Sequence, residues 1–380
     1  TSQSFQETVS WPGGPRLALR PDSSLPLIVI KAGVPGGLLA EQKGEEGLAS
    51  LTAEVWPMAA GGLDRSTFLR AAERIGATFT ASSGRNTFFL TAHFPSENKD
   101  EGLRLMAQII KNPRFSADDL EEARQDRLAD LRQQSEDPAA RVALISRTSL
   151  YGKGHPYSLN PLGTQESVES IKPEDMVAYI SRVLRPQKLV VAAVGDFDSQ
   201  WLVRELKENL ADWRLSEEGS AVPVPPEPRF AISTTVANEV LDRAQSHLRI
   251  SFPVAGLGHP DQAALEVLSD YLGGGMGGPM FMELREKRGL AYDLYAQYLP
   301  GLNSGELSFY IATDPVKTRE AREWLEAIIA RFREQSLSQE ELKGARLQTL
   351  GKRKRAEETS TDQADEAMLN LLYGLGLDFE

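Results

Sequence analysis

Residues 115–124 read FSADDLEEAR, and residues 337–346 read LSQEELKGAR. In each stretch an apolar residue precedes a serine, Ser116 or Ser338, and acidic residues follow the serine within one turn. A serine at a helix N-cap accepts a hydrogen bond from a backbone N–H group, and carboxylates in the first turn suit the positive end of the helix dipole. We therefore expect a helix to begin directly after each serine.

The segments that precede the two serines also correspond. Residues 88–92 (FFLTA) predict a buried strand that leads into a helical pattern, and residues 306–310 (ELSFY) predict the same succession of elements. An echo at an offset of about 220 residues indicates one domain type used twice. Strands and helices mix within each half. We therefore predict an α+β fold of two homologous domains, each a mainly antiparallel mixed sheet with helices packed on one face.

A proline-rich segment separates the two halves. Residues 216–229 read SEEGSAVPVPPEPR, and prolines at this density favour an extended connector over a helix or a strand. We therefore predict an N-terminal domain at 1–215, a linker at 216–228 and a C-terminal domain at 229–380. Further apolar patterns predict strands at 27–30, 189–194 and 248–252, and helices at 47–59, 65–75, 138–150, 173–183, 199–209, 262–272 and 279–287.

Composition excludes several classes of protein. The formal net charge of -12 makes nucleic acid an unfavourable partner, because phosphate backbones would repel the chain. The absence of cysteine excludes disulfides, thiol nucleophiles and cysteine-based zinc sites. No apolar run approaches the roughly 20 residues that cross a bilayer, so we expect no membrane span.

The N-terminal residues bear on location. Thr1 to Ser4 show neither an initiator Met nor the pattern of a signal peptide. We expect an extracytoplasmic (periplasmic) location if a signal peptide has been removed, and a cytoplasmic location otherwise.

Two further segments carry a family resemblance. Residues 44–54 read GEEGLASLTAE, and residues 284–292 read LREKRGLAY. They resemble two motifs of the pitrilysin/insulinase-type (inverzincin) zinc metallopeptidases, the H-x-x-E-H helix and a Leu-Arg-Glu-Lys-x-Gly-Leu-Ala-Tyr element. The resemblance extends over nearly the whole chain and implies the same two-domain fold.

The first motif is degenerate. In active members the two histidines bind zinc and the glutamate activates the attacking water. Those positions hold Ser50, Ala53 and Glu54 here, and the family's third ligand, a glutamate on a later helix, falls near Asp130. We expect Glu54 and Asp130 to be solvated or hydrogen-bonded carboxylates, not a cation site. No two of the four histidines are spaced as a zinc pair on one helical face: His93, His155, His247 and His259.

The second motif matches at every defined position. In active enzymes the matching arginine and tyrosine reach a zinc site that the other half or subunit contributes, and here they are Arg285 and Tyr292. A guanidinium and a phenol can donate hydrogen bonds to the oxyanion that forms when water attacks a peptide carbonyl. Gly289 fits a helix C-cap, which would end the helix that carries Arg285 and begin the strand that carries Tyr292.

Together the motifs imply a non-zinc-binding subunit of a heterodimeric zinc endopeptidase. Such a subunit would bind no cofactor itself, would pair with a homologous H-x-x-E-H subunit that holds the zinc, and would act on unfolded or short peptides. The alternative is a scaffold or binding subunit of the core-protein type without a role in proteolysis. The run Gly273–Gly278 lacks the ending of a phosphate loop, so nucleotide binding is not expected.

Overall fold

The structure, a computed structural model, describes residues 4–9, 11–213 and 234–379, so the expected linker lies outside the described residues. The chain forms two compact units, and each contains one sheet. Unit 1 comprises residues 1–131, 160–223 and 357–380, and unit 2 comprises residues 132–159 and 224–356. The units thus differ from the sequential domains that we predicted, because residues 132–159 and 357–380 each join the unit built mainly from the other half of the sequence.

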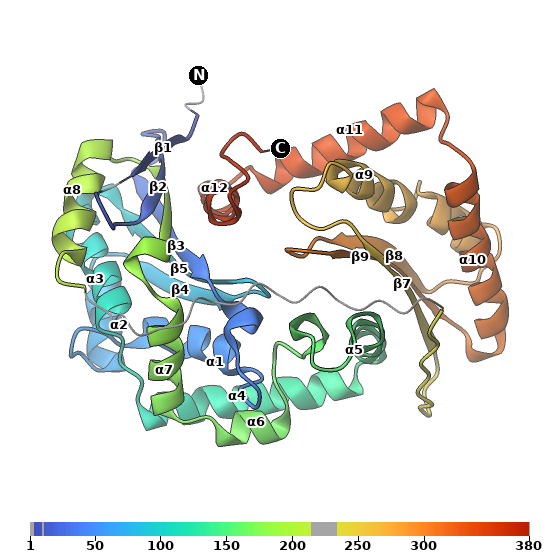
Figure 1. The fold of residues 1–380 in the computed structure, drawn as a ribbon, viewed down its shortest axis with the longest axis horizontal. Helices are drawn as coiled ribbons and strands as arrows, with labels where there is room; N and C mark the ends of the chain where they lie inside the picture. Colours follow the sequence, from blue (N-terminus) through green and yellow to red (C-terminus); the bar gives the residue numbers. More distant parts are fainter. Residues whose placement is uncertain (1–3, 10, 214–233, 380) are drawn as a thin grey trace. The chain divides into compact units, whose positions relative to one another are not determined.

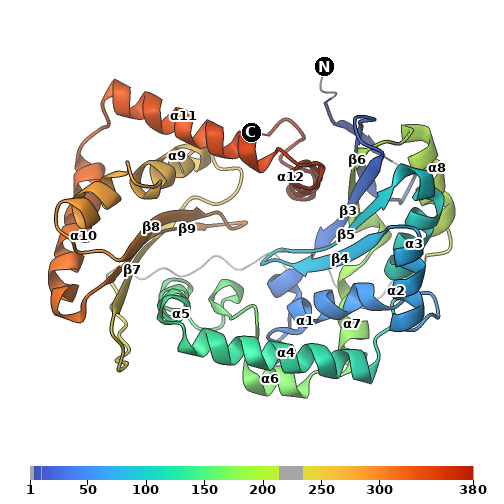
Figure 2. The same cartoon turned by 180° about the vertical axis from the view of Figure 1, so that it is seen from behind.

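Unit 1 is built on a six-stranded sheet with the order β1-β2-β6-β3-β5-β4 (Figures 1 and 2). Neighbouring strands are antiparallel except β2 and β6, which are parallel. The strands are β1 (Gln6–Val9), β2 (Arg16–Pro21), β3 (Leu27–Pro35), β4 (Thr78–Ser83), β5 (Thr87–Pro95) and β6 (Val190–Gly195). The α-helices are α1 (Leu48–Val55), α2 (Arg65–Arg74), α3 (Lys99–Lys111), α4 (Ala117–Glu136), α6 (Gln165–Ser170), α7 (Pro173–Val183), α8 (Ser199–Leu210) and α12 (Ser360–Tyr373). The short 3-10 helices are η1 (Gly37–Ala40), η2 (Trp56–Met58), η3 (Ser96–Asn98) and η5 (Pro186–Lys188). The last residues of α4, from 132 on, belong to unit 2.

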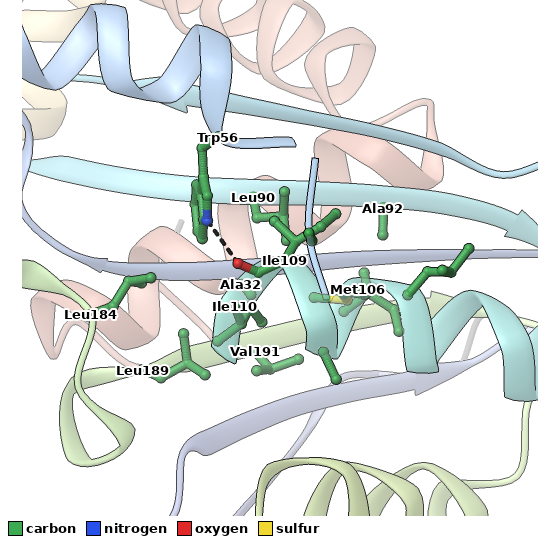
Figure 3. Close-up of a cluster of buried hydrophobic side chains, with 14 of the residues drawn as sticks. Ala32, Trp56, Leu90, Ala92, Met106, Ile109, Ile110, Leu184, Leu189 and Val191 are labelled. Atoms are coloured by element: carbon green, nitrogen blue, oxygen red, sulfur yellow. Dashed lines mark hydrogen bonds between the residues drawn. The ribbon is translucent and has the colours of Figure 1, made fainter. Parts of the chain in front are cut away.

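The main core of unit 1 lies between one face of this sheet and helices that include α1, α3 and α7. Alternate residues of a strand point to opposite faces, so Ile28, Ile30 and Ala32 of β3 all enter this core. Trp56 lies fully buried in this core and donates its indole N–H to the carbonyl of Ile109, at 2.9 Å (Figure 3). This bond satisfies the one polar atom of the Trp56 side chain.

The second face of the same sheet is covered by α12 (Figure 2). Val29 of β3 and the alternate residues of β6 pack against buried Met368 of this helix. Two polar contacts fix the helix: Lys31 forms an ion pair with Asp365 at 2.7 Å, and His93 shares a 2.9 Å hydrogen bond with Thr361. The sheet of unit 1 therefore carries helices on both faces, whereas we had expected one.

Unit 2 contains a three-stranded antiparallel sheet with the order β7-β9-β8. Its strands are β7 (Ser246–Val254), β8 (Asp293–Leu299) and β9 (Gly305–Thr313). Its helices are α5 (Pro138–Tyr151), η4 (Pro156–Ser158), α9 (Gln262–Gly273), the wider π-helical turn η6 (Phe281–Glu286), η7 (Pro315–Lys317), α10 (Thr318–Glu334) and α11 (Gln339–Ala356).

The two faces of this second sheet differ in polarity. Leu307, Phe309 and Ile311 of β9 enter an apolar core beneath α9 and α10. The opposite face is polar and centres on a fully buried ion pair, in which Arg249 donates to Glu306 at 3.1 Å. Helix α5 packs on this face through β7. Each sheet thus receives one helix from the other half of the sequence.

The repeat that the sequence indicates is present in both units. Strand β5 leads through α3 to α4, and strand β9 leads through α10 to α11. Ser116 accepts a hydrogen bond from the N–H of Asp119 at 3.1 Å, and Ser338 accepts one from the N–H of Glu341 at 3.2 Å. The predicted α+β fold class is therefore confirmed. Within the described residues no helix combines the length and the apolar character needed to cross a membrane.

Candidate functional site

Arg285 and Tyr292 lie together at a corner of unit 2 between a helix and a strand. The π-helical turn η6 carries Arg285, and Gly289, with a φ of 59°, lets the chain turn at the end of this helix. The N–H of Tyr292 donates to the carbonyl of Ala312 at 2.9 Å, which fixes Tyr292 at the start of β8. Arg285 then donates to the backbone carbonyl of Tyr292 at 3.2 Å. The helix that carries Arg285 is therefore followed by a glycine turn, and Tyr292 lies directly before the strand instead of within it.

Arg285 differs from the neighbouring cations in its ion pairing. Glu283 forms ion pairs with both Lys287 and Arg288, at 2.5 and 2.6 Å. Among the residues that the structure describes, no carboxylate forms an ion pair with Arg285. Its guanidinium lies 5.3 Å from the centre of the Phe281 ring, which holds it without neutralising it.

Both side chains are open to solvent. Arg285 is exposed, and the side chain of Tyr292 keeps 55% of its surface accessible. An exposed guanidinium and an exposed phenol can each donate hydrogen bonds to an oxygen that carries negative charge.

The degenerate motif occupies α1 in unit 1. Ser50 and Glu54 lie four residues apart on one face of this helix, and both face α4. Arg127 of α4, only 6% exposed, donates to the hydroxyl of Ser50 and to the carboxylate of Glu54, the latter at 3.1 Å. Burial raises the pKa of Glu54, and the Arg127 guanidinium partly opposes that shift.

These residues do not fit a zinc ion. Ala53 is buried and offers only a methyl group, and Ser50 uses its hydroxyl in a 2.7 Å bond to the carbonyl of Pro161. Asp130 is exposed on α4. No group of three or more histidine, aspartate or glutamate side chains among residues 4–9, 11–213 and 234–379 could hold a metal.

Arg127 is the residue that we did not identify from the sequence. It follows buried Leu120 and Ala123 at the helical spacing of 3 and 4 residues, so it lies on the buried face of α4, where an arginine needs a hydrogen-bonding partner. This spacing is the feature of the sequence that indicates a buried arginine. The sequence alone did not show that its partners would be Ser50 and Glu54.

The glycine run has a packing role at its first residue. A Cβ atom at Gly273 would lie 2.1 Å from the backbone nitrogen of Ala296, so only glycine lets α9 approach β8. Gln348 of α11 donates to the carbonyl of Gly274 at 3.0 Å. These contacts attach the beginning of the run to its own unit.

Two family models match most of the chain. The model described as insulinase (peptidase family M16) matches residues 23–159, and the model described as peptidase M16 inactive domain matches residues 170–349. The first match contains the degenerate motif, and the second contains Arg285 and Tyr292.

Individual relatives and a solved structure agree with these matches. The chain is 26% identical over 359 residues to the "Non-peptidase homolog YmxG" of Helicobacter pylori, covering 93% of this chain and 81% of that protein. It is 26% identical over 261 residues to an "Uncharacterized zinc protease" of Mycobacterium leprae, covering 69% of this chain but only 58% of that protein's length. The crystal structure of a peptidase M16 inactive domain from Pseudomonas fluorescens superimposes with a TM-score of 0.87 at 22% identity, covering 99% of this chain and 89% of that one.

Proposed function

The chain belongs to the M16 (insulinase) peptidase family, and on that premise we propose that it is the non-zinc-binding subunit of a two-subunit zinc endopeptidase. In this proposal a homologous subunit carries H-x-x-E-H and the zinc ion. This chain supplies Arg285 and Tyr292 to the partner's active site. The substrates are unfolded or short peptides.

One observation carries the proposal: an exposed guanidinium without an ion-pair partner among the described residues contacts the backbone of an exposed tyrosine. Arg285 has no carboxylate partner among the described residues, although Glu283, two positions away, neutralises two other cations. Residues two positions apart on a helix do not face each other, so Glu283 pairs with Lys287 and Arg288 and leaves the positive charge of Arg285 available to another molecule.

The proposed mechanism assigns hydrogen-bond donation to this chain. Zinc in the partner would activate water for attack on the peptide carbonyl. The guanidinium of Arg285 and the phenol of Tyr292 would donate to the carbonyl oxygen as its negative charge develops. Because donors placed in advance favour the transition state over the ground state, they should raise kcat more than they lower KM.

A peptide-cleavage assay with the reconstituted pair tests this role. The variants Arg285→Ala and Tyr292→Phe each remove one donor, and kcat should fall by about 100- to 1000-fold per donor while KM changes little. Arg319→Ala is the matched control, because Arg319 is an exposed arginine of the same unit that pairs with Glu323 at 3.0 Å. Unchanged kcat in both site variants, with association intact, would remove the catalytic role.

The alternative function is that of a scaffold without proteolysis. The printed name of the Helicobacter pylori relative, a non-peptidase homolog, favours it. A scaffold would bind its partner equally well in native form and in the Arg285→Ala form, and neither form would change peptide cleavage. Measuring association and cleavage in the same samples therefore separates the two functions.

A further inference from the structure

Arg127 contacts both ligand positions of the degenerate zinc motif at once. One guanidinium nitrogen donates to the hydroxyl of Ser50 and another donates to a carboxylate oxygen of Glu54 at 3.1 Å. We infer that residue 127 occupies the third ligand position of this motif, and that its guanidinium takes the place of the metal cation and excludes one. This inference needs no partner subunit and goes beyond the proposed function.

Geometry favours position 127 over position 130. Side chains at 50 and 54 lie one turn apart on one helical face, so a group that reaches both must lie in the space between them. Arg127 meets this condition and is buried. Asp130 is exposed, and no hydrogen bond joins it to Ser50 or Glu54 in the described residues. The family resemblance in the sequence had placed the third ligand near Asp130, three residues after Arg127 on α4.

Charge explains why a metal would be excluded. A zinc ion held at positions 50 and 54 would lie about 2 Å from its ligand atoms, within the space that the guanidinium fills. Two cations at such a separation repel strongly, above all where burial weakens screening by water. Arg127 also serves Glu54 as a counter-charge, in an ion pair at 3.1 Å. This ion pair thus takes the place of metal binding.

Zinc binding to variants of the isolated full-length chain tests the inference. The first variant, S50H/E54H, restores both imidazoles but keeps Arg127. The second, S50H/E54H/R127E, completes a His-His-Glu set. Titration calorimetry at pH 7.5 should show one zinc ion bound to the second variant at least roughly 100-fold more tightly than to the first, since even changes outside the ligand set cost 10- to 100-fold in affinity.

A third variant distinguishes the two candidate positions on α4. S50H/E54H/R127A/D130E removes the cation and places the glutamate at 130, and it should bind zinc more weakly than S50H/E54H/R127E. Equal or tighter binding would overturn the assignment of position 127. Equal binding by S50H/E54H and S50H/E54H/R127E would overturn the exclusion of metal by Arg127.

Circular dichroism checks that each variant folds. Should S50H/E54H/R127E fail to fold, S50H/E54H/R127Q provides the comparison, because glutamine keeps hydrogen-bonding groups but removes the charge. Zinc should then bind more tightly to the glutamine variant than to S50H/E54H. Affinity that does not rise when the charge is removed would overturn the inference.

Discussion

Gly33 of β3 and Met368 of α12 pack so closely that the effect of enlarging Gly33 on stability can be predicted from the structure. A Cβ atom added at Gly33 would lie 2.4 Å from the sulfur of Met368 and 3.2 Å from its Cγ. Both distances are shorter than a van der Waals contact, and Met368 is fully buried against the sheet. The substitution Gly33→Ala should therefore displace Met368 and loosen α12.

The expected magnitudes follow from packing. Overfilling a core by one methyl group costs about 1–3 kcal/mol, so Gly33→Ala should lower the free energy of unfolding by that amount. Met368→Ala should lower it by about 2–5 kcal/mol, because it removes a buried side chain and leaves a cavity. In the double variant the new methyl group enters that cavity. The combined loss should therefore be smaller than the sum by about 0.5–3 kcal/mol.

Urea denaturation followed by circular dichroism measures the four free energies of this cycle, and amide hydrogen exchange of residues 360–373 reports on α12 itself. Gly33→Ala combined with Leu350→Ala is the control pair, because Leu350 is 52% exposed on α11 and does not belong to this contact. That control should be additive. Additivity within about 0.5 kcal/mol for Gly33→Ala and Met368→Ala would refute the reasoning.

Two further predictions concern a buried carboxyl and a helix cap. Burial raises the pKa of Glu41 from 4.5 to about 8. The contribution of this carboxyl group to the free energy of unfolding is therefore fully present below pH 4.5 and is lost as pH rises through 8. Glu41→Gln should flatten the decline in urea midpoint between these two pH values, and an unchanged slope would contradict this. Ser338→Ala removes the acceptor for the N–H of Glu341 and should lower the free energy of unfolding by about 1 kcal/mol. Ser338→Asp keeps an acceptor and should lower it little. Equal losses of stability in thermal denaturation would argue against a capping role for Ser338.

Features that depend on neighbouring residues were predictable from the sequence. Arg285, Gly289 and Tyr292 lie within eight residues, so a helix end followed by a strand places them together without information from the rest of the fold. The serine caps at Ser116 and Ser338 are equally local, and with them the repeat of the two units. Local steric and hydrogen-bonding rules suffice for both cases.

Features that depend on distant contacts were not predicted. Ala364, Ala367, Met368 and Leu371 show the spacing of an amphipathic helix, yet nothing in that pattern specifies that α12 covers the sheet of the first half. Arg127 presents the same difficulty, since its partners lie more than 70 residues away along the chain. Choosing among possible partners requires the packed arrangement of helices and sheet, which a single sequence does not state.

The position of α12 has a consequence during synthesis. Strands β2 to β6 are complete once the ribosome has passed residue 195, but the helix that covers their second face follows only at residues 360–373. At typical elongation rates the interval is on the order of 10 s or more. During that time Val29, Val190 and Val194 lack the covering that α12 later provides, so we expect the nascent chain to expose this apolar surface until residues 360–373 have been synthesised.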